Sequence, residues 1–504
     1  MVKNFFRRCK YRNFLLNSHH VNNIFFAMLT FGICLITLIA AYFLYGGLLS
    51  RIAKLNPKAD VPSKTHYDGV DYMPLPRWRI FLIQLLNIAG TGPIFGAILG
   101  ACYGPVAFLW ITLGGIFMGA MHDFFAGVIS LRNGGKSLPE TIGKYLGGNM
   151  RRLSLIEIPI LMLLVGGVFI VTPSNILTSM TDVPYLAWVG IIIVYYFIAT
   201  ILPVDKIIGK LYPIFGAALI FMALAMFGVI VFGDFEVPEL TSLDNKHFNS
   251  ENLPILPTLF ISIACGAISG FHATQSPLMA RCMTSEVQAR PIFFGAMISE
   301  SIIALIWAAV AMAFFGGVEG LNGWMADNSS DAGLAVSTIS KETLGVAGSI
   351  LALLGVVAAP ITSGDTAFRS ARLIIADMLN IDQRPIVKRL LVSIPLFAIG
   401  IGIASIDFDV IWRYFAWSNQ ALSVLTLWMI SSWLMRHNYR YSLLAIIPAI
   451  IMTYVCSSFI FVSSQFVGMG ACDLAYIYGG ALTAVISGLM ILNIRRLTRH
   501  ETNI

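Results

Sequence analysis

Apolar runs of about 20 residues recur along the whole sequence and limit the folds that it can adopt. A helix of about 20 residues crosses the roughly 30 Å hydrocarbon core of a bilayer and satisfies its own backbone hydrogen bonds there. Hydrophobic residues form 57% of the 504-residue chain, charged residues form 12%, and the mean hydropathy is +0.79. A soluble domain carries far less apolar surface. We therefore predict an all-α polytopic membrane protein.

The apolar runs divide the chain into thirteen predicted transmembrane helices. They cover residues 24–49, 81–100, 104–130, 153–172, 185–203, 209–233, 254–276, 293–316, 345–368, 387–405, 409–435, 442–463 and 475–494. Residues 1–80 form a basic segment, one helix and a cytoplasmic connector, and residues 436–504 form two further helices and a basic tail. Between them we predict a ten-helix core at 81–435, built from the repeats 81–233 and 254–435.

The charged residues predict how the helices are oriented. The net charge is +7, but Lys and Arg lie almost entirely in short connectors, so nucleic acid is not indicated as a partner. The connectors 131–152, 277–292 and 367–390 are basic and are predicted to face the cytoplasm, whereas 234–254 and 317–344 are acidic and are predicted to face outward. The C-terminus then lies in the cytoplasm. The basic N-terminus would lie outside, against this rule, if the first run spans the membrane.

The seven cysteines are scattered and form no C-x-x-C pair. This spacing indicates neither a disulfide framework nor a zinc site. We expect no metal or cofactor apart from a coupling ion.

Two predicted spans are interrupted near their centres by residues that weaken a helix. The first break contains Gly90, Thr91, Gly92 and Pro93, and the second contains Gly266, Ser269 and Gly270. Four spans lie between the two, so each set of five helices begins with a broken helix and the sets enter the membrane from opposite sides. This is the pattern of an inverted repeat whose discontinuous helices form a binding site.

The alternative is that these glycines only allow helices to pack closely. We favour the binding site, because unpaired N–H groups at the half-helix starts near Gly92 and Gly270 would receive a carboxylate. The predicted substrate-binding residues are Gly90, Thr91, Gly92, Ser269, Gly270, Phe271 and His272.

Ionisable residues within the spans are few and are candidates for ion coupling. Asp365 lies among hydroxyl side chains, which suit Na⁺, while a lone carboxylate suits H⁺. The alternatives are an i,i+4 pair of Asp365 with Arg369, a core role for His272, and helix-joining roles for Asp123 and Glu300. The predicted coupling residues are Asp365, Thr362, Ser363, Thr366, Asp123 and Glu300.

Several stretches resemble the carbon starvation protein A (CstA) family of bacterial membrane transporters. They are DGVDYMPLPRWRI, IAGTGPIFGAILG, MGAMHDFFAGVISLRNGGKSLPE, ACGAISGFHATQSP, GAMISES, SGDTAFRSARLIIADML and WRYFAWSNQALS. The chain departs from the family in having Ile83 and Gln84 where better-known members have a His-His pair, and those members are longer.

The resemblance implies a LeuT-like fold of the amino acid, polyamine and organocation superfamily. It also implies uptake of peptides or pyruvate during carbon starvation, by proton symport for pyruvate. In such a fold the eighth core helix, here 345–368, faces the first broken helix, and carbonyls around Ile88 to Gly90 would complete a cation shell with the hydroxyls.

We therefore expect a secondary transporter that binds a small molecule within the lipid bilayer and uses an H⁺ or Na⁺ gradient. A membrane nutrient sensor that keeps the transporter fold is the alternative. An enzyme is not expected, because the sequence has neither H-E-x-x-H nor G-x-x-x-x-G-K-[ST]. The sequence leaves the oligomeric state open, a homo-oligomer included.

Overall fold

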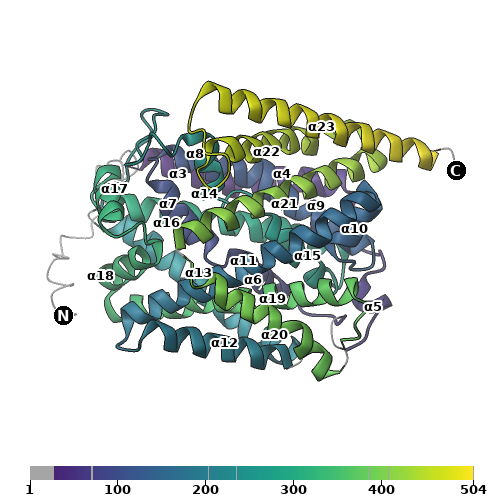
Figure 1. Ribbon diagram of the computed structural model, residues 1–504, viewed down its shortest axis with the longest axis horizontal. Helices are drawn as coiled ribbons and strands as arrows, with labels where there is room; N and C mark the ends of the chain where they lie inside the picture. The colour runs from purple at the N-terminus through teal and green to yellow at the C-terminus, as the bar shows by residue number, and fades with distance from the viewer. Residues whose placement is uncertain are drawn as a thin grey trace, which may run out of the picture.

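The computed structural model describes residues 28–69, 72–201, 204–233, 235–383, 385–406 and 408–502 (Figure 1). Every regular element within these ranges is a helix or a helical turn, which confirms the predicted all-α class. The basic segment of residues 1–27, on which the N-terminal orientation depends, lies outside the described residues.

Each predicted span overlaps one or more helices, although the predicted connector 317–344 is itself largely helical. The elements of the first half are α3 (Leu29–Phe43), α4 (Tyr45–Ile52), α5 (Pro62–Thr65), α6 (Arg77–Ala89), η1 (Gly92–Gly96), α7 (Ala97–Ala101), α8 (Val106–Leu109), η2 (Trp110–Ala120), α9 (Met121–Arg132), α10 (Leu138–Leu146), α11 (Gly148–Met180), α12 (Tyr185–Ile201) and α13 (Val204–Phe232). Those of the second half are η3 (Ile255–Leu259), α14 (Phe260–Ser262), α15 (Gly270–Ala280), η4 (Glu286–Gln288), η5 (Arg290–Phe294), α16 (Gly295–Phe314), α17 (Val318–Asp327), α18 (Ala332–Ala352), η6 (Leu353–Val357), α19 (Ala358–Met378), α20 (Ile386–Ile403), α21 (Phe408–His437), η7 (Tyr439–Tyr441), α22 (Leu443–Val462) and α23 (Asp473–Thr502).

Within the described ranges, eight helices are long and apolar enough to cross a membrane, or nine if the bent pair Arg77–Ala89 and Gly92–Ala101 counts as one span. Of the other predicted spans, 185–203 coincides with the shorter α12, 254–276 is interrupted, and 345–368 and 409–435 lie in helices that are not among the eight. The total of thirteen and the inverted repeat therefore stay predictions. In Figure 1, α22 and α23 lie along one side of the bundle and α12 and α20 along the other, with α6, α11, α15 and α19 between them.

The first predicted break is present. Helix α6 ends at Ala89, and the chain bends by 54° before η1 and α7 continue. Gly90 has a φ of +31°, and a Cβ at this position would lie 2.7 Å from the Phe169 ring of α11. A side chain at Gly90 would therefore meet both an unfavourable backbone angle and a packed aromatic ring.

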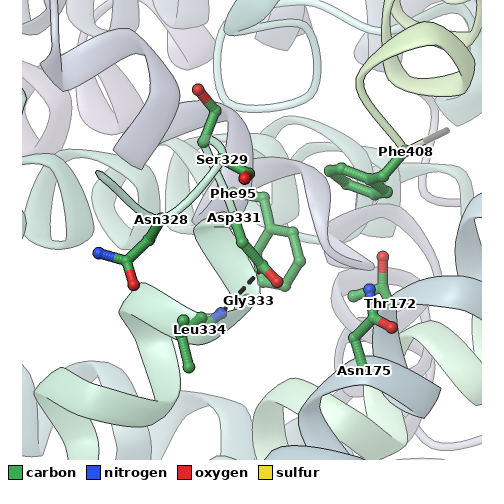
Figure 2. A pocket seen from close by; sticks show the side chains of 10 residues that line it. Phe95, Thr172, Asn175, Asn328, Ser329, Asp331, Gly333, Leu334 and Phe408 are labelled. Carbon is green, nitrogen blue, oxygen red and sulfur yellow. Dashed lines mark hydrogen bonds between the residues drawn. The ribbon is translucent and has the colours of Figure 1, made fainter. Parts of the chain in front are cut away.

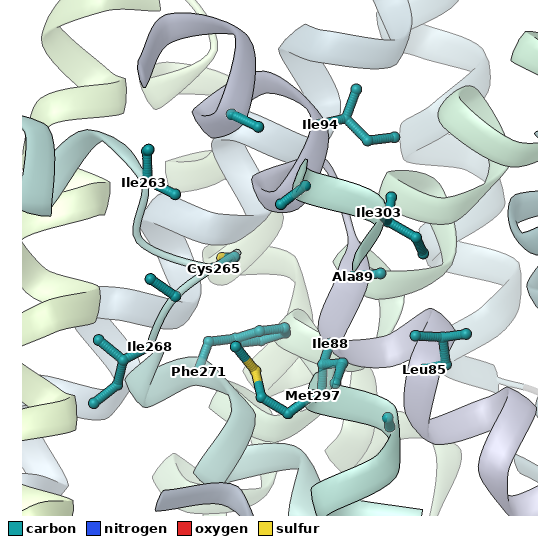
Figure 3. Packing of buried hydrophobic residues seen from close by; sticks show 14 of the residues in the cluster. Leu85, Ile88, Ala89, Ile94, Ile263, Cys265, Ile268, Phe271, Met297 and Ile303 are labelled. Atoms are coloured by element: carbon teal, nitrogen blue, oxygen red, sulfur yellow. The ribbon is translucent and has the colours of Figure 1, made fainter. Parts of the chain in front are cut away.

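The second predicted break is also present and touches the first. The chain is not helical between Ser262, the end of α14, and Gly270, the start of α15. A Cβ at Gly92 would lie 2.3 Å from the Cβ of Cys265, so the two breaks are in direct contact. Figure 3 shows Cys265 of the second break on the side that faces Ala89 of α6, and Phe271 and Met297 between Ile268 and Ile88.

The packing interpretation of the glycines also holds at Gly270. A Cβ there would lie 2.5 Å from the carbonyl oxygen of Asn419 in α21. Gly270 thus lets the start of α15 rest directly on the backbone of α21.

Connectors that were predicted to share a face of the membrane do lie together. The Arg132 side chain forms an ion pair with Glu286 at 2.6 Å and donates to the Ala53 carbonyl oxygen at 2.7 Å. On another side, the Asn322 amide donates to the carbonyl oxygens of Cys102 at 3.0 Å and Lys246 at 2.8 Å. Which of the two faces is cytoplasmic stays a prediction from charge.

The connector before η3 contains a histidine that is buried in its neutral form. His247 packs against the Tyr103 ring at 4.7 Å and the Phe248 ring at 4.5 Å, and its Nδ1 accepts a hydrogen bond from the Asn249 N–H at 3.0 Å. Burial, with a smaller contribution from the positive charge of Arg413, lowers the pKa of His247 to about 4. Folding therefore favours the neutral imidazole.

Acidification is expected to destabilise the fold through His247. An unfolded histidine has a pKa of about 6.5, so the neutral state contributes its full stability above that pH and loses it as the pH falls toward about 4. We expect the wild-type melting temperature to fall more between pH 7 and pH 4.5 than that of His247→Gln, by a difference equivalent to about 2 kcal/mol. Thermal unfolding followed by tryptophan fluorescence in detergent measures this. His66→Gln, at an exposed position, is the control, and equal pH dependence in all three proteins would contradict the prediction.

Candidate functional site

The two broken helices carry buried polar side chains that lack hydrogen-bond partners within the described chain. In α6 and the first break, the side chains of Gln84, Asn87 and Thr91 are fully buried and accept or donate no hydrogen bond within the described part of the chain. The Gln275 Oε1 of α15 is also buried without a hydrogen-bond partner in this part of the chain. Because buried polar groups are normally paired, these side chains indicate a place for a polar ligand, water or an ion.

An amide pair from α21 holds the second break open. The Asn419 Oδ1 accepts hydrogen bonds from the Phe271 N–H at 2.8 Å and from the Ser269 hydroxyl at 3.1 Å. The neighbouring Gln420 side chain donates to the Ile268 carbonyl oxygen at 3.0 Å. Asn419 therefore takes one of the N–H donors that were predicted to receive a substrate carboxylate at the start of α15.

Sequence reasoning did not single out Asn419 or Gln420. The signal was two adjacent amides inside an otherwise apolar span, in WSNQALS. Uncharged polar side chains at such depth satisfy backbone groups that a broken helix leaves unpaired.

His272 from the predicted substrate site and Asp123 and Glu300 from the predicted coupling site form one buried ionic cluster together with His122. The His272 Nδ1 lies 2.9 Å from the Asp123 Oδ2, and the His122 Nδ1 lies 2.8 Å from the Asp123 Oδ1. The His272 Nε2 lies 3.4 Å from the Glu300 Oε2. All four side chains are fully buried, so α9, α15 and α16 meet at this cluster.

Asp365 is held by two neighbours. Its Oδ2 accepts from the Tyr212 hydroxyl at 3.3 Å and from Arg369 at 3.5 Å, and Arg369 also donates to the Ala199 carbonyl oxygen at 2.9 Å. The i,i+4 pair with Arg369 that the sequence offered as an alternative is thus present in the structure. Arg369 was placed in a connector, whereas it is buried inside α19.

The predicted hydroxyls separate into two groups. The Thr362 hydroxyl donates to the Ala359 carbonyl oxygen of its own helix at 2.8 Å, and the Thr366 hydroxyl donates to Ser363 in the same way at 2.9 Å. Ser363 alone reaches α6, where its hydroxyl donates to the Leu86 carbonyl oxygen at 3.2 Å.

α19 therefore contacts the first broken helix, which is the contact that the family resemblance implies for the predicted span 345–368. A second contact joins the Ser363 hydroxyl to the Asn87 carbonyl oxygen at 3.4 Å. These contacts fall just before the expected carbonyls of Ile88 to Gly90, and Asp365 has its own partners in Tyr212 and Arg369.

A cavity of about 540 Å³ lies beside the first break. Figure 2 shows Phe95 of η1 at this cavity, with Thr172 and Asn175 of α11 on one side and the loop before α18 on the other. Asp331 in that loop accepts a hydrogen bond from the Leu334 N–H at 3.0 Å and so caps α18. The buried Phe95, which lines the cavity, follows the first break directly along the chain.

Comparison with known proteins identifies the family. Residues 26–185 and 171–346 match the family described as carbon starvation protein CstA. The chain belongs to the CstA family. It is 43% identical over 339 residues to a membrane protein of Haemophilus influenzae, which covers 57% of this chain and 91% of that one.

Two CstA-family relatives are named as transporters. The chain is 26% identical over 460 residues to the peptide transporter CstA of Campylobacter jejuni, covering 76% of this chain and 62% of the relative. It is also 26% identical over 367 residues to the pyruvate/proton symporter BtsT of Escherichia coli, covering 60% of this chain and 50% of the relative. The chain thus spans between half and two thirds of the length of these two proteins.

Solved structures confirm the LeuT-like transporter fold that is predicted for this CstA-family member. The manganese transporter of Eremococcus coleocola matches with a TM-score of 0.53 at 13% identity, over 85% of this chain and 99% of that one. MhsT in complex with L-phenylalanine matches with a TM-score of 0.52 at 12% identity, over 84% and 99%. At such low identity the likeness concerns the fold alone.

Proposed function

We propose that this CstA-family protein is a secondary active transporter that imports a small nutrient, a peptide or a pyruvate-like carboxylate, during carbon starvation. An H⁺ or Na⁺ gradient across the bacterial cell membrane drives the import, and the C-terminus lies in the cytoplasm. The named peptide and pyruvate transporters among its relatives support this class of substrate. The observation that carries the proposal is the contact of two broken helices at a buried centre with unpaired polar atoms.

The substrate binds at this crossing. The amide side chains of Gln84 and Asn87 and the hydroxyl of Thr91 offer donors and acceptors that nothing else in the described chain uses. Neutral groups of this kind pair with a carboxylate or a peptide group without adding a second buried charge. The cavity at Phe95 is the route of access in this proposal.

The coupling ion acts where α19 meets α6. Ser363 joins the two helices at the carbonyl oxygens of Leu86 and Asn87, so an ion bound there favours one arrangement of the broken helix over another. Asp365, two residues further along α19, supplies the negative charge that links binding of the ion to movement of the substrate.

Counterflow in proteoliposomes tests transport directly. Vesicles that contain the purified protein are loaded with unlabelled pyruvate, alanine or a dipeptide, and entry of the labelled compound is followed with an inward H⁺ gradient, an inward Na⁺ gradient or neither. We expect at least tenfold faster entry of one compound than in protein-free vesicles, and stimulation by one of the two gradients. A sensor would bind a ligand but give no counterflow, and that result would overturn the proposal.

A further inference from the structure

The second break brings a cysteine to the buried ionic cluster. The Cys265 Sγ, a ring nitrogen of His272 and a carboxylate oxygen of Glu300 all lie within 4.8 Å of one another. Cys265 is 4% exposed and the other two side chains are fully buried. Thiolate, imidazole and carboxylate are the three side-chain ligands that proteins use for zinc.

The His272 Nε2 and the Glu300 Oε2 are as far apart as two ligand atoms of one tetrahedral metal ion. The Nε2 and the Oε2 are 3.4 Å apart, yet the Nε2 and both Glu300 oxygens have no hydrogen-bond partner in the described chain. A zinc ion bonds nitrogen and oxygen ligands at roughly 2.0–2.2 Å, which puts two ligands of a tetrahedron about 3.4 Å apart. The unpaired atoms are therefore spaced for an ion between them.

The surroundings orient His272 as a metal ligand. An ionised Asp123 can only accept, so we assign the His272 Nδ1–H as the donor at 2.9 Å, which leaves the Nε2 lone pair on the side of Glu300. Asp123 is fixed in turn by His122 at 2.8 Å. The Asn419 side chain lies 3.7 Å from the Cys265 Sγ as a donor. A carboxylate behind the ligating imidazole is the usual outer support of a zinc site.

We propose that Cys265, His272 and Glu300 bind one divalent transition-metal ion of the zinc class, with His272 coordinating through Nε2. The thiolate and imidazole favour such an ion over Mg²⁺ and Ca²⁺, which prefer oxygen ligands alone. Three protein ligands leave a fourth position for water or a carboxylate oxygen. The ion would join α15 to α16 directly, and to α9 through Asp123. This inference does not rest on the proposed transport function.

Metal binding by the purified full-length protein tests the site. The protein carries an affinity tag without histidine, is stripped with a chelator, and is dialysed against Zn²⁺ or Co²⁺ in detergent. We expect one equivalent of bound zinc, and with Co²⁺ a near-ultraviolet thiolate-to-cobalt absorption band. Neither measurement requires a substrate or a transport assay, so failure here is separate from failure of the proposed function.

Variants assign the ligands. Cys265→Ser is expected to remove the cobalt–thiolate band, Glu300→Gln to lower zinc affinity at least tenfold, and Asp123→Asn, behind the ligand, to lower it 10-fold to 100-fold. Cys456→Ser, at a buried cysteine in α22, is the matched control and should keep both the band and the stoichiometry. Gel filtration establishes that each variant is folded.

Two results would overturn the proposal. One is a wild-type protein that binds no stoichiometric zinc and shows no thiolate band with Co²⁺, which would make the cluster an ionic network between helices. The other is zinc binding that persists unchanged in both Cys265→Ser and Glu300→Gln, which would place the ion elsewhere.

Discussion

Asp365→Asn is expected to abolish accumulation of the substrate against its gradient, with at least a tenfold loss in steady-state uptake. Asparagine keeps the shape of the side chain and an oxygen for the Tyr212 hydroxyl, but it removes the negative charge that faces Arg369. If that charge completes the coupling site, the carrier can no longer link substrate movement to the ion. Exchange should survive better than net uptake, because exchange does not require the empty carrier to return.

The structural contact with Arg369 demands a stability control for this prediction. Removing one partner of a buried ion pair costs about 3–5 kcal/mol, so Asp365→Asn also lowers the melting temperature if Arg369 finds no other acceptor than Ala199. Uptake and exchange are therefore measured on the same preparation, at equal amounts of monodisperse protein. Thr343→Val, whose hydroxyl donates only to the Ile339 carbonyl oxygen of its own helix in α18, is the control.

The ratio of exchange to accumulation separates the two roles of Asp365. A purely structural role lowers both in proportion, whereas a coupling role lowers accumulation far more. A variant that concentrates substrate as the wild type does, with unchanged H⁺ and Na⁺ dependence, would show that Asp365 takes no part in coupling.

The contact of Ser363 with α6 shows how far the sequence could predict this part of the site. Its hydroxyl is the group of α19 that reaches the Leu86 and Asn87 carbonyl oxygens. Sequence reasoning grouped it with Thr362 and Thr366, because a hydroxyl cluster in a span is visible in the letters. Which hydroxyl points away from its own helix depends on the rotation of α19, and the neighbouring helix sets that rotation.

The positions of the two breaks were predictable for a related reason. Glycine and proline in an apolar run disfavour a continuous helix wherever they occur, so Gly90 and Gly270 mark the interruptions without knowledge of the fold. The sequence does not show which side chain pairs with each backbone group that the breaks leave free. Asn419 lies 148 residues from Phe271, the residue whose N–H it accepts, and no local pattern joins the two.

The cluster of cysteine, histidine and glutamate also could not be predicted from the sequence. Cys265, His272 and Glu300 have none of the spacings by which metal sites are recognised in a sequence, so the scattered cysteines predicted no zinc site. The break between α14 and α15 turns the Cys265 side chain toward His272, and α16 adds Glu300 from the next span. The family resemblance identified the fold and the class of protein, whereas these side-chain contacts required the structure.

Asn419→Ala is expected to reduce transport at least tenfold while the protein still inserts and folds. The change removes the oxygen that accepts from the Phe271 N–H and the Ser269 hydroxyl. A buried donor left unpaired costs about 1–3 kcal/mol, and each 1.4 kcal/mol corresponds to about a factor of ten in population. The start of α15 then leaves its position more often, and this disturbs the crossing of the two broken helices.

Two further variants test whether the effect of Asn419→Ala comes from the loss of the accepting oxygen. Asn419→Asp keeps an oxygen at the same place and should retain more transport than Asn419→Ala. Ser431→Ala, about three turns further along α21, removes a hydroxyl that donates to the Leu427 carbonyl oxygen of its own helix at 2.8 Å, and it should transport as the wild type does. Initial uptake rates, measured at equal amounts of protein, and the melting temperature of each variant test this prediction. If Asn419→Ala transported at the wild-type rate, the second break would keep its geometry without the amide, and Gly270 packed on the α21 backbone would be sufficient to position α15.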